Sequence, residues 1–153
     1  MELNAVELFK IAQIIEQKGI TFYEKAWDYS NKDKEKEIFL KLANMEREHL
    51  RFFSLMERKA ENCSYQNQED VEAYLREHFP SSFFNEDDSR KIGKELKEMK
   101  EIIEFSIERE KDSIEFYNLI SKKLTNIDDS NLKALMTIIK EEESHVKMLK
   151  ELL

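Results

Sequence analysis

Hydrophobic residues recur at alternating three- and four-residue steps along four stretches of the chain. These stretches cover about residues 5–29, 33–61, 90–122 and 130–152. Such spacing places the hydrophobic residues of each stretch on one face of an α-helix, where they form a stripe that packs against neighbouring helices. The pattern therefore predicts four long amphipathic helices and an all-α fold.

Polar and capping residues mark the ends of these helices. Asn4 with Glu7 has the spacing of a capping box at the start of the first helix, and Ser89 is a candidate N-cap for the third. Polar breaks at residues 30–32 and 126–129 separate the first helix from the second and the third from the fourth. We expect each break to be a turn that closes a helical hairpin.

A long connector joins the two hairpins. It covers about residues 62–88 and contains a short helical pattern at 69–78, which ends before Phe79-Pro80. A connection of this length lets the second and third helices run parallel, as in four-helix bundles with a crossover. The sequence predicts one domain over residues 1–153, with hairpins at about 5–61 and 89–152.

The two hairpins repeat one pattern. Glu16 and Phe22-Tyr23 recur 94 residues later as Glu110 and Phe116-Tyr117, with Ile15 and Arg109 before the two glutamates. The Glu-x-x-His step at Glu46 recurs 96 residues later at Glu142. A bundle built from such a repeat places equivalent residues opposite one another in its middle.

Each hydrophobic stripe is interrupted at its centre by a carboxylate. In the second and fourth helices a histidine follows one helical turn later, on the same face. The six interrupting residues are Glu16, Glu46, His49, Glu110, Glu142 and His145.

Four carboxylates in a dry core repel each other and lose their hydration. Two divalent cations would cancel these four charges, and the histidines would add neutral nitrogen ligands. One Glu-x-x-His step is a weak signal, because 33 of the 153 residues are acidic. Two such steps, each centred in a hydrophobic stripe and accompanied by a lone glutamate on each remaining helix, predict a two-metal site. The alternative is a protonated or water-filled polar layer.

The amino-acid composition indicates which classes of binding partner and which compartment to expect. The net charge is −8 and no basic patch is present, which argues against nucleic acid and anionic membranes as partners. Cys63 is the one cysteine, so no internal disulfide or CxxC pair can form, and we expect it to be unreactive. The N-terminal residues lack the pattern of a signal peptide and no hydrophobic run approaches transmembrane length, so we expect a cytoplasmic protein.

The ligand segments resemble the rubrerythrin family, within the ferritin-like superfamily of di-iron and di-manganese carboxylate proteins. The resemblance lies in residues 16–24, 46–49, 110–117 and 142–145. It implies a ferritin-like four-helix bundle that holds two iron ions through bridging and terminal glutamates. Manganese and zinc suit the same ligands.

Two departures from that family bear on activity. The four cysteines of a rubredoxin domain are missing, so we expect electrons from an external donor protein such as a rubredoxin. Rubrerythrins also tend to carry a further glutamate one turn after the third-helix ligand, where this chain has Ser113. The exchange of metal ligands during the redox cycle, for which rubrerythrins use this glutamate, is therefore not expected in this chain.

The leading functional hypothesis is an oxidoreductase that reduces hydrogen peroxide or dioxygen. Gly19 and Ser113 are small and would leave room for the oxidant near the metals. The alternatives are ferrous iron oxidation and storage, as in ferritins, and a redox-silent bundle that the metal only stabilises. We expect a homodimer, within which the long connector would permit an exchange of hairpins.

Residues around the predicted ligands have less specific roles. Tyr23 and Tyr117 would either donate hydrogen bonds to ligand carboxylates or act as ordinary core aromatics. His78 is expected to be exposed. The phenylalanines of the connector, Phe79, Phe83 and Phe84, would cap the end of the bundle or pack against a second subunit. Three glutamates beside the ligands point off the stripes and are expected to be solvated, with a contact to a ligand residue as the alternative: Glu48, Glu141 and Glu143.

Overall fold

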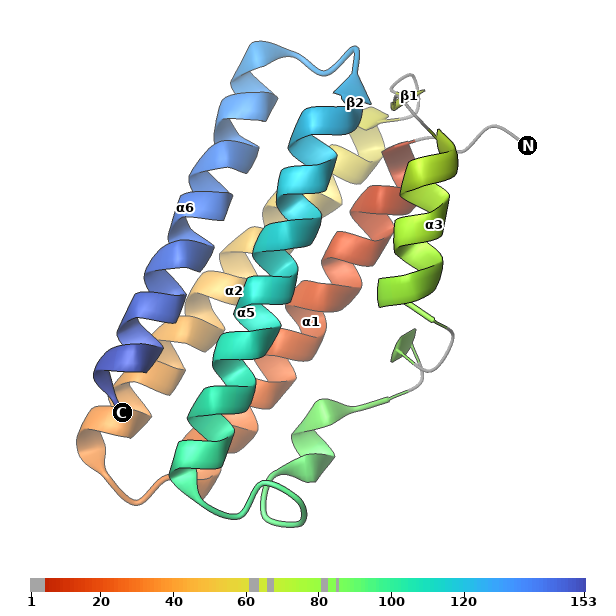
Figure 1. The fold of residues 1–153 in the computed structure, drawn as a ribbon. Helices are drawn as coiled ribbons and strands as arrows, with labels where there is room; N and C mark the ends of the chain where they lie inside the picture. The colour runs from red at the N-terminus through yellow and green to blue at the C-terminus, as the bar shows by residue number, and fades with distance from the viewer. Residues whose placement is uncertain (1–4, 61–63, 66–67, 81–82, 85) are drawn as a thin grey trace.

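The computed structural model describes residues 5–60, 64–65, 68–80, 83–84 and 86–153. Four long helices form a bundle (Figure 1): α1 (Ala5–Tyr29), α2 (Asp33–Lys59), α5 (Met99–Lys123) and α6 (Asp129–Glu151). The predicted all-α fold is confirmed. None of the helices described is both long enough and apolar enough to cross a membrane.

Short turns close the two helical hairpins. Between α1 and α2, the Ser30 N–H donates to the carbonyl of Ala26 and ends the first helix. Between α5 and α6, Asn126 takes a positive φ of 62°, and the Asp128 side chain accepts a hydrogen bond from the Asn131 N–H to cap α6. The predicted capping box at Asn4 lies outside the described residues.

The connector runs back along the bundle, so that α2 and α5 point the same way (Figure 1). It contains α3 (Gln68–His78) and the 3₁₀ turn η2 (Asp88–Lys91). Phe79 packs edge-on against Phe116 of α5, with ring centroids 5.0 Å apart. The connector therefore lies along the side of α1 and α5 within its own chain, and its described residues do not cap the end of the bundle as one of the two roles expected for its phenylalanines would require.

A two-stranded pairing that the sequence pattern did not predict ties the connector to the opposite hairpin. Strand β1 (Ser64–Tyr65) pairs antiparallel with β2 (Leu124–Thr125), with Ser64 opposite Thr125. Two-residue strands carry no periodic signal, so only the tertiary arrangement reveals them.

The predicted start of the third long helix at residue 90 is wrong. The Asp87 carboxylate accepts from the Ser89 N–H and caps η2, so Ser89 is not the N-cap of a long helix. Gly93 then takes a positive φ of 86°, which ends helical geometry. The long helix α5 begins at Met99, where the Glu101 carboxylate accepts from the Glu98 N–H.

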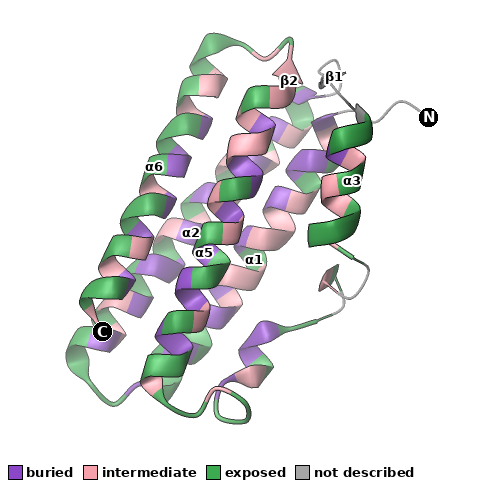
Figure 2. Cartoon of the chain, in the orientation of Figure 1, coloured by how far each residue is buried: buried purple, intermediate pink, exposed green. Residues whose placement is uncertain are grey.

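Two hydrophobic clusters fill the bundle, one toward each end. The stripes of the helices face inward, as the buried residues in Figure 2 show. One cluster centres on Phe9, Phe53 and Phe116, and the other on Phe39 and Ile103. A layer of buried polar side chains lies between the clusters and contains the interruptions of the four stripes.

Candidate metal centre

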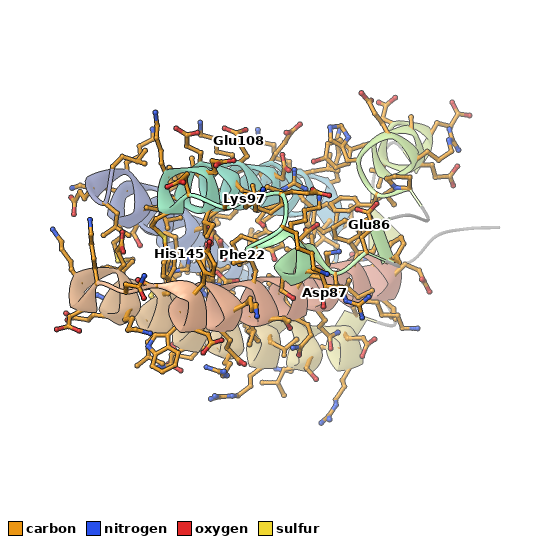
Figure 3. The ribbon with its side chains drawn as sticks, turned by 90° about the horizontal axis from the view of Figure 1, so that it is seen from below. Phe22, Glu86, Asp87, Lys97, Glu108 and His145 are labelled. Carbon is orange, nitrogen blue, oxygen red and sulfur yellow. The ribbon has the colours of Figure 1, made fainter. Side chains whose placement is uncertain are left out.

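The six interrupting side chains converge in this polar layer. Each of the four long helices contributes, and every one of these residues is buried, with at most 4% of its surface exposed. Seen from below, Phe22 and His145 lie between the helices while Glu108 lies on the outside of α5 (Figure 3). The hydrophobic stripes that drive helix packing also bring the six residues together: Glu16, Glu46, His49, Glu110, Glu142 and His145.

The six residues form two overlapping groups. In each group, one potential ligand atom per residue lies within 4.8 Å of the others. Glu46 and Glu142 belong to both groups and are therefore placed to bridge two ions. Glu16 with His49 completes one group, and Glu110 with His145 completes the other.

Both histidines turn the Nδ1 nitrogen toward the carboxylates. His49 Nδ1 lies 2.8 Å from Glu142 Oε1 and 3.6 Å from Glu16 Oε1. His145 Nδ1 lies 3.2 Å from Glu46 Oε1 and 3.4 Å from Glu110 Oε2. The rings stand nearly parallel, with centroids 5.8 Å apart.

Four buried atoms of the cluster make no hydrogen bond, although three of them belong to the ion-pair contacts of His145. They are Glu16 Oε2, Glu46 Oε1, Glu110 Oε2 and His145 Nδ1. Buried polar atoms are nearly always satisfied, and an unsatisfied one costs free energy. All four are potential metal ligands that point into the same space, so the residues present fit a pair of divalent cations.

In the metal-free cluster, protons on the histidines offset the negative charge of the carboxylates. Burial lowers the pKa of His49, but hydrogen bonds to Glu142 and Glu16 outweigh burial and raise that pKa to about 11. His145 behaves alike, with its pKa raised to about 10 by Glu110 and Glu142. Burial, together with the charges of Glu110 and Glu16, raises the pKa of Glu142 well above its usual value. Neutralising this cluster by metal ions would require these protons to leave.

Two tyrosines link the hairpins through the terminal carboxylates. The Tyr23 hydroxyl on α1 donates to Glu110 on α5 at 2.5 Å, and the Tyr117 hydroxyl on α5 donates to Glu16 on α1 at 2.6 Å. Burial raises the pKa of both tyrosines well above 10, so they remain protonated donors. Of the two roles open to these tyrosines, the structure shows the hydrogen bonds to the carboxylates.

The outer nitrogens of the histidines have different partners. His49 Nε2 lies 2.6 Å from Oε2 of Glu141, whereas His145 Nε2 lies 3.3 Å from the sulfur of Met45. Of the two roles expected for Glu141, the structure shows the contact with a ligand residue, because its carboxylate reaches across from α6 to α2. Glu48 and Glu143 are exposed, as expected. Helix periodicity alone could not find the contact of Glu141, which depends on how the two hairpins face each other.

These contacts define two halves of the centre. The His49 half contains Glu16, His49, Tyr117 and Glu141. The His145 half contains Glu110, His145, Tyr23 and Met45. Glu46 and Glu142 are shared between the halves.

A cavity of about 90 Å³ reaches the centre from the connector side. Its inner wall includes Gly19, Glu46 and Glu110, and its outer part includes Phe83 and His78. A Cβ atom at position 19 would lie 3.3 Å from Glu46 Oε2, which is a tight contact. Gly19 therefore keeps space open beside a shared carboxylate.

Two residues outside the centre were singled out by the sequence. His78 is exposed, as expected, and stacks on Tyr74 with ring centroids 4.0 Å apart. Its position at the cavity was not anticipated, because the path of the connector has no signature in the sequence. Cys63 lies outside the described residues.

Comparison with known proteins identifies the family and a similar fold. The family profile described as rubrerythrin matches residues 7–153. A solved structure from Thermotoga maritima, described as a ferritin-like diiron-carboxylate protein, is similar with a TM-score of 0.69 and 26% identity. The similarity covers 99% of this chain and 95% of that one. No curated protein matches the chain.

Proposed function

This chain belongs to the rubrerythrin family, and from that premise we propose that it is a di-iron oxidoreductase that reduces hydrogen peroxide or dioxygen. The observation that carries the proposal is the small cavity that ends at two buried carboxylates of the metal-binding cluster. A redox-silent structural site needs no such access. The identity of the metal as iron, and the reaction itself, are parts of the proposal.

The cavity gives a small oxidant access to the shared carboxylate of Glu46. Its volume of about 90 Å³ exceeds the roughly 10–15 Å³ that one water molecule requires on the same measure, so hydrogen peroxide and dioxygen, which are of similar size, fit this space. Gly19 contributes to the fit, because any larger residue would press on Glu46.

In the proposed centre, Glu46 and Glu142 would bridge the two ions, and one glutamate and one histidine would complete each half. When iron is bound, two ferrous ions each supply one electron, so that hydrogen peroxide and two protons become two water molecules. The protein's own contribution is to hold four carboxylates in place between two hydrophobic clusters. The hydrophobic clusters on both sides exclude solvent.

The tyrosines would keep the terminal carboxylates oriented. A hydrogen bond from a neutral donor to a buried carboxylate favours its ionised, metal-binding form. Burial raises the pKa of Glu110, but hydrogen bonds, including the one from Tyr23, outweigh it, and the net shift is downward. Tyr23 also lines the cavity, so it would hold Glu110 on the side where the oxidant arrives.

Electrons would come from outside the chain. The single cysteine cannot build the four-thiolate iron site of a rubredoxin. A small electron-transfer protein of that kind is therefore the expected donor. A homodimer remains the expected assembly, and size-exclusion chromatography would distinguish it from a ferritin-like cage.

The test is anaerobic loading of the protein with Fe²⁺ followed by rapid mixing with hydrogen peroxide. We expect about two irons per chain and a rise of near-ultraviolet absorption from ferric iron at close to one peroxide per two irons. Glu142→Ala should lose iron and signal together. Glu143→Ala, an exposed neighbour, is the matched control and should behave as the wild type.

The outcomes separate the hypotheses. Iron that stays ferrous in the presence of peroxide would contradict the oxidoreductase. Rapid oxidation by dioxygen, with continued uptake far beyond two irons per chain, would favour iron storage instead.

A further inference from the structure

The two halves of the centre differ at one pair of equivalent positions. Met45 and Glu141 each directly precede the glutamate of a Glu-x-x-His step, 96 residues apart. Each contacts the outer nitrogen of the histidine on the opposite hairpin. The repeat therefore places an anion behind His49 and a thioether behind His145.

This difference acts directly on the histidine. A histidine that binds a metal through Nδ1 carries its proton on Nε2, which is then a donor. A carboxylate that accepts this hydrogen bond fixes the ring orientation and makes Nδ1 a stronger ligand. A thioether is only a weak acceptor. His49 is therefore better prepared to bind a cation than His145.

The two halves of the centre also differ in how accessible they are from the cavity. Among the described residues, the cavity wall includes Glu110 and Tyr23 of the His145 half, but none of Glu16, His49, Tyr117 and Glu141. The half without carboxylate support is thus also the half that the cavity reaches.

We propose that Glu141 is a positioning residue that makes the two metal positions unequal. The position at His49 binds its ion more tightly and retains it, while the position at His145 binds more weakly and exchanges first. This inference rests on the proposed metal centre, and concerns binding rather than turnover.

The experiment is an anaerobic titration of the metal-free protein with Co²⁺, followed by calorimetry and visible absorption. The wild type should show two separate binding steps. Glu141→Gln keeps the shape but removes the charge, and should weaken the tighter step by about 10- to 100-fold while the weaker step is unchanged. Glu141→Asp, which retains a carboxylate, should recover part of the loss.

Two further variants make the test specific. Glu143→Gln removes the same charge from an exposed position two residues away and should change neither step. Met45→Glu places a carboxylate behind His145 and should tighten the weaker step, which tests the idea even if changes at Glu141 impair folding. Two indistinguishable steps in the wild type, or equal effects of Glu141→Gln and Glu143→Gln, would overturn the inference.

The result also separates this inference from the proposed function. A wild-type protein that binds no Co²⁺ would contradict both the proposed metal centre and this inference. Two unequal Co²⁺ positions in a protein whose iron form does not react with peroxide would support this inference and contradict only the proposed oxidoreductase activity.

Discussion

The His49 half and the His145 half have the same inner groups and different surroundings. Each half has one terminal glutamate, one histidine and one tyrosine that donates across the hairpins. Behind the histidines the halves diverge, with Glu141 on one side and Met45 on the other. The cavity reaches one half.

The comparison shows where a repeat constrains a protein and where it does not. Residues that would hold the metals keep their chemical type in both hairpins. Residues one step further out, which touch only one histidine each, have diverged. The following predictions test the equivalence of the halves, from the largest expected effect to the smallest.

Removing a shared carboxylate should damage both halves, whereas removing a terminal one should damage one. Glu142 belongs to both groups and Glu16 to one. We expect Glu142→Ala to bind almost no iron and Glu16→Ala to keep about one iron per chain, against about two in the wild type. Metal analysis after gel filtration measures this, and equal losses in the two variants would contradict the assignment of bridging and terminal roles.

Removing the metals should destabilise the bundle, because ions that bind only the folded state stabilise it. An ion at about 100 times its dissociation constant stabilises the folded state by about 2.7 kcal/mol. At about 2–4 °C per kcal/mol for a chain of this size, each ion should raise the melting temperature by about 5–10 °C. Calorimetry with and without a chelator measures the shift, and an unchanged melting temperature would argue against any resident metal.

The metal-free protein should lose stability as the pH rises. The pKa values of His49 and His145 are raised to about 11 and about 10. The stability that this protonation provides is complete below the unfolded value of about 6.5 and is lost as the pH rises toward 10 and 11. Each proton released on unfolding contributes a slope of about 1.4 kcal/mol per pH unit. Urea unfolding at several pH values measures the slope; a metal-free protein that becomes more stable above neutrality would contradict it.

The two tyrosines should contribute equally if the halves are equivalent at this level. Tyr117→Phe and Tyr23→Phe each remove a hydrogen bond to a buried carboxylate. We expect each to cost about 1–3 kcal/mol of unfolding free energy in the metal-free protein. Tyr29→Phe, whose exposed hydroxyl bonds a backbone carbonyl, is the control and should cost less. A large difference between the two buried tyrosines would extend the asymmetry to the hydroxyl groups.

Gly19→Ala should reduce the access that distinguishes the His145 half. The new methyl group would press on Glu46 Oε2 and narrow the cavity at its wall. If the narrower path adds about 1 kcal/mol to the activation free energy, the iron-loaded protein should react with peroxide about fivefold more slowly, with iron content retained. Ser113→Ala, also at the cavity wall, changes little volume and is the control. An unchanged rate would show that the oxidant enters elsewhere.

Particular residues show what the sequence can and cannot predict. The six candidate ligands and the four-helix fold were evident from the stripes and their interruptions, because helix geometry converts spacing directly into a shared face. The family was indicated by the resemblance of the ligand segments. The start of α5 was placed at residue 90 because Ser89 is a good N-cap residue type, whereas Gly93 and the capping pair Glu98 and Glu101 mark the true start at Met99. The β1–β2 pairing was missed because each strand has two residues.

The sequence by itself determined which residues would meet in the middle of the bundle, because periodicity fixes the buried face of each helix. Only the tertiary structure decided what stands behind each histidine, since the reach of Glu141 and Met45 depends on how one hairpin faces the other. It also decided where the cavity opens, because the path of the connector over α1 and α5 follows from packing of Phe79 and Phe83, and not from a repeating pattern. Neighbouring residues determine the local geometry of each helix. The free energy of the whole fold determines which distant segments come into contact.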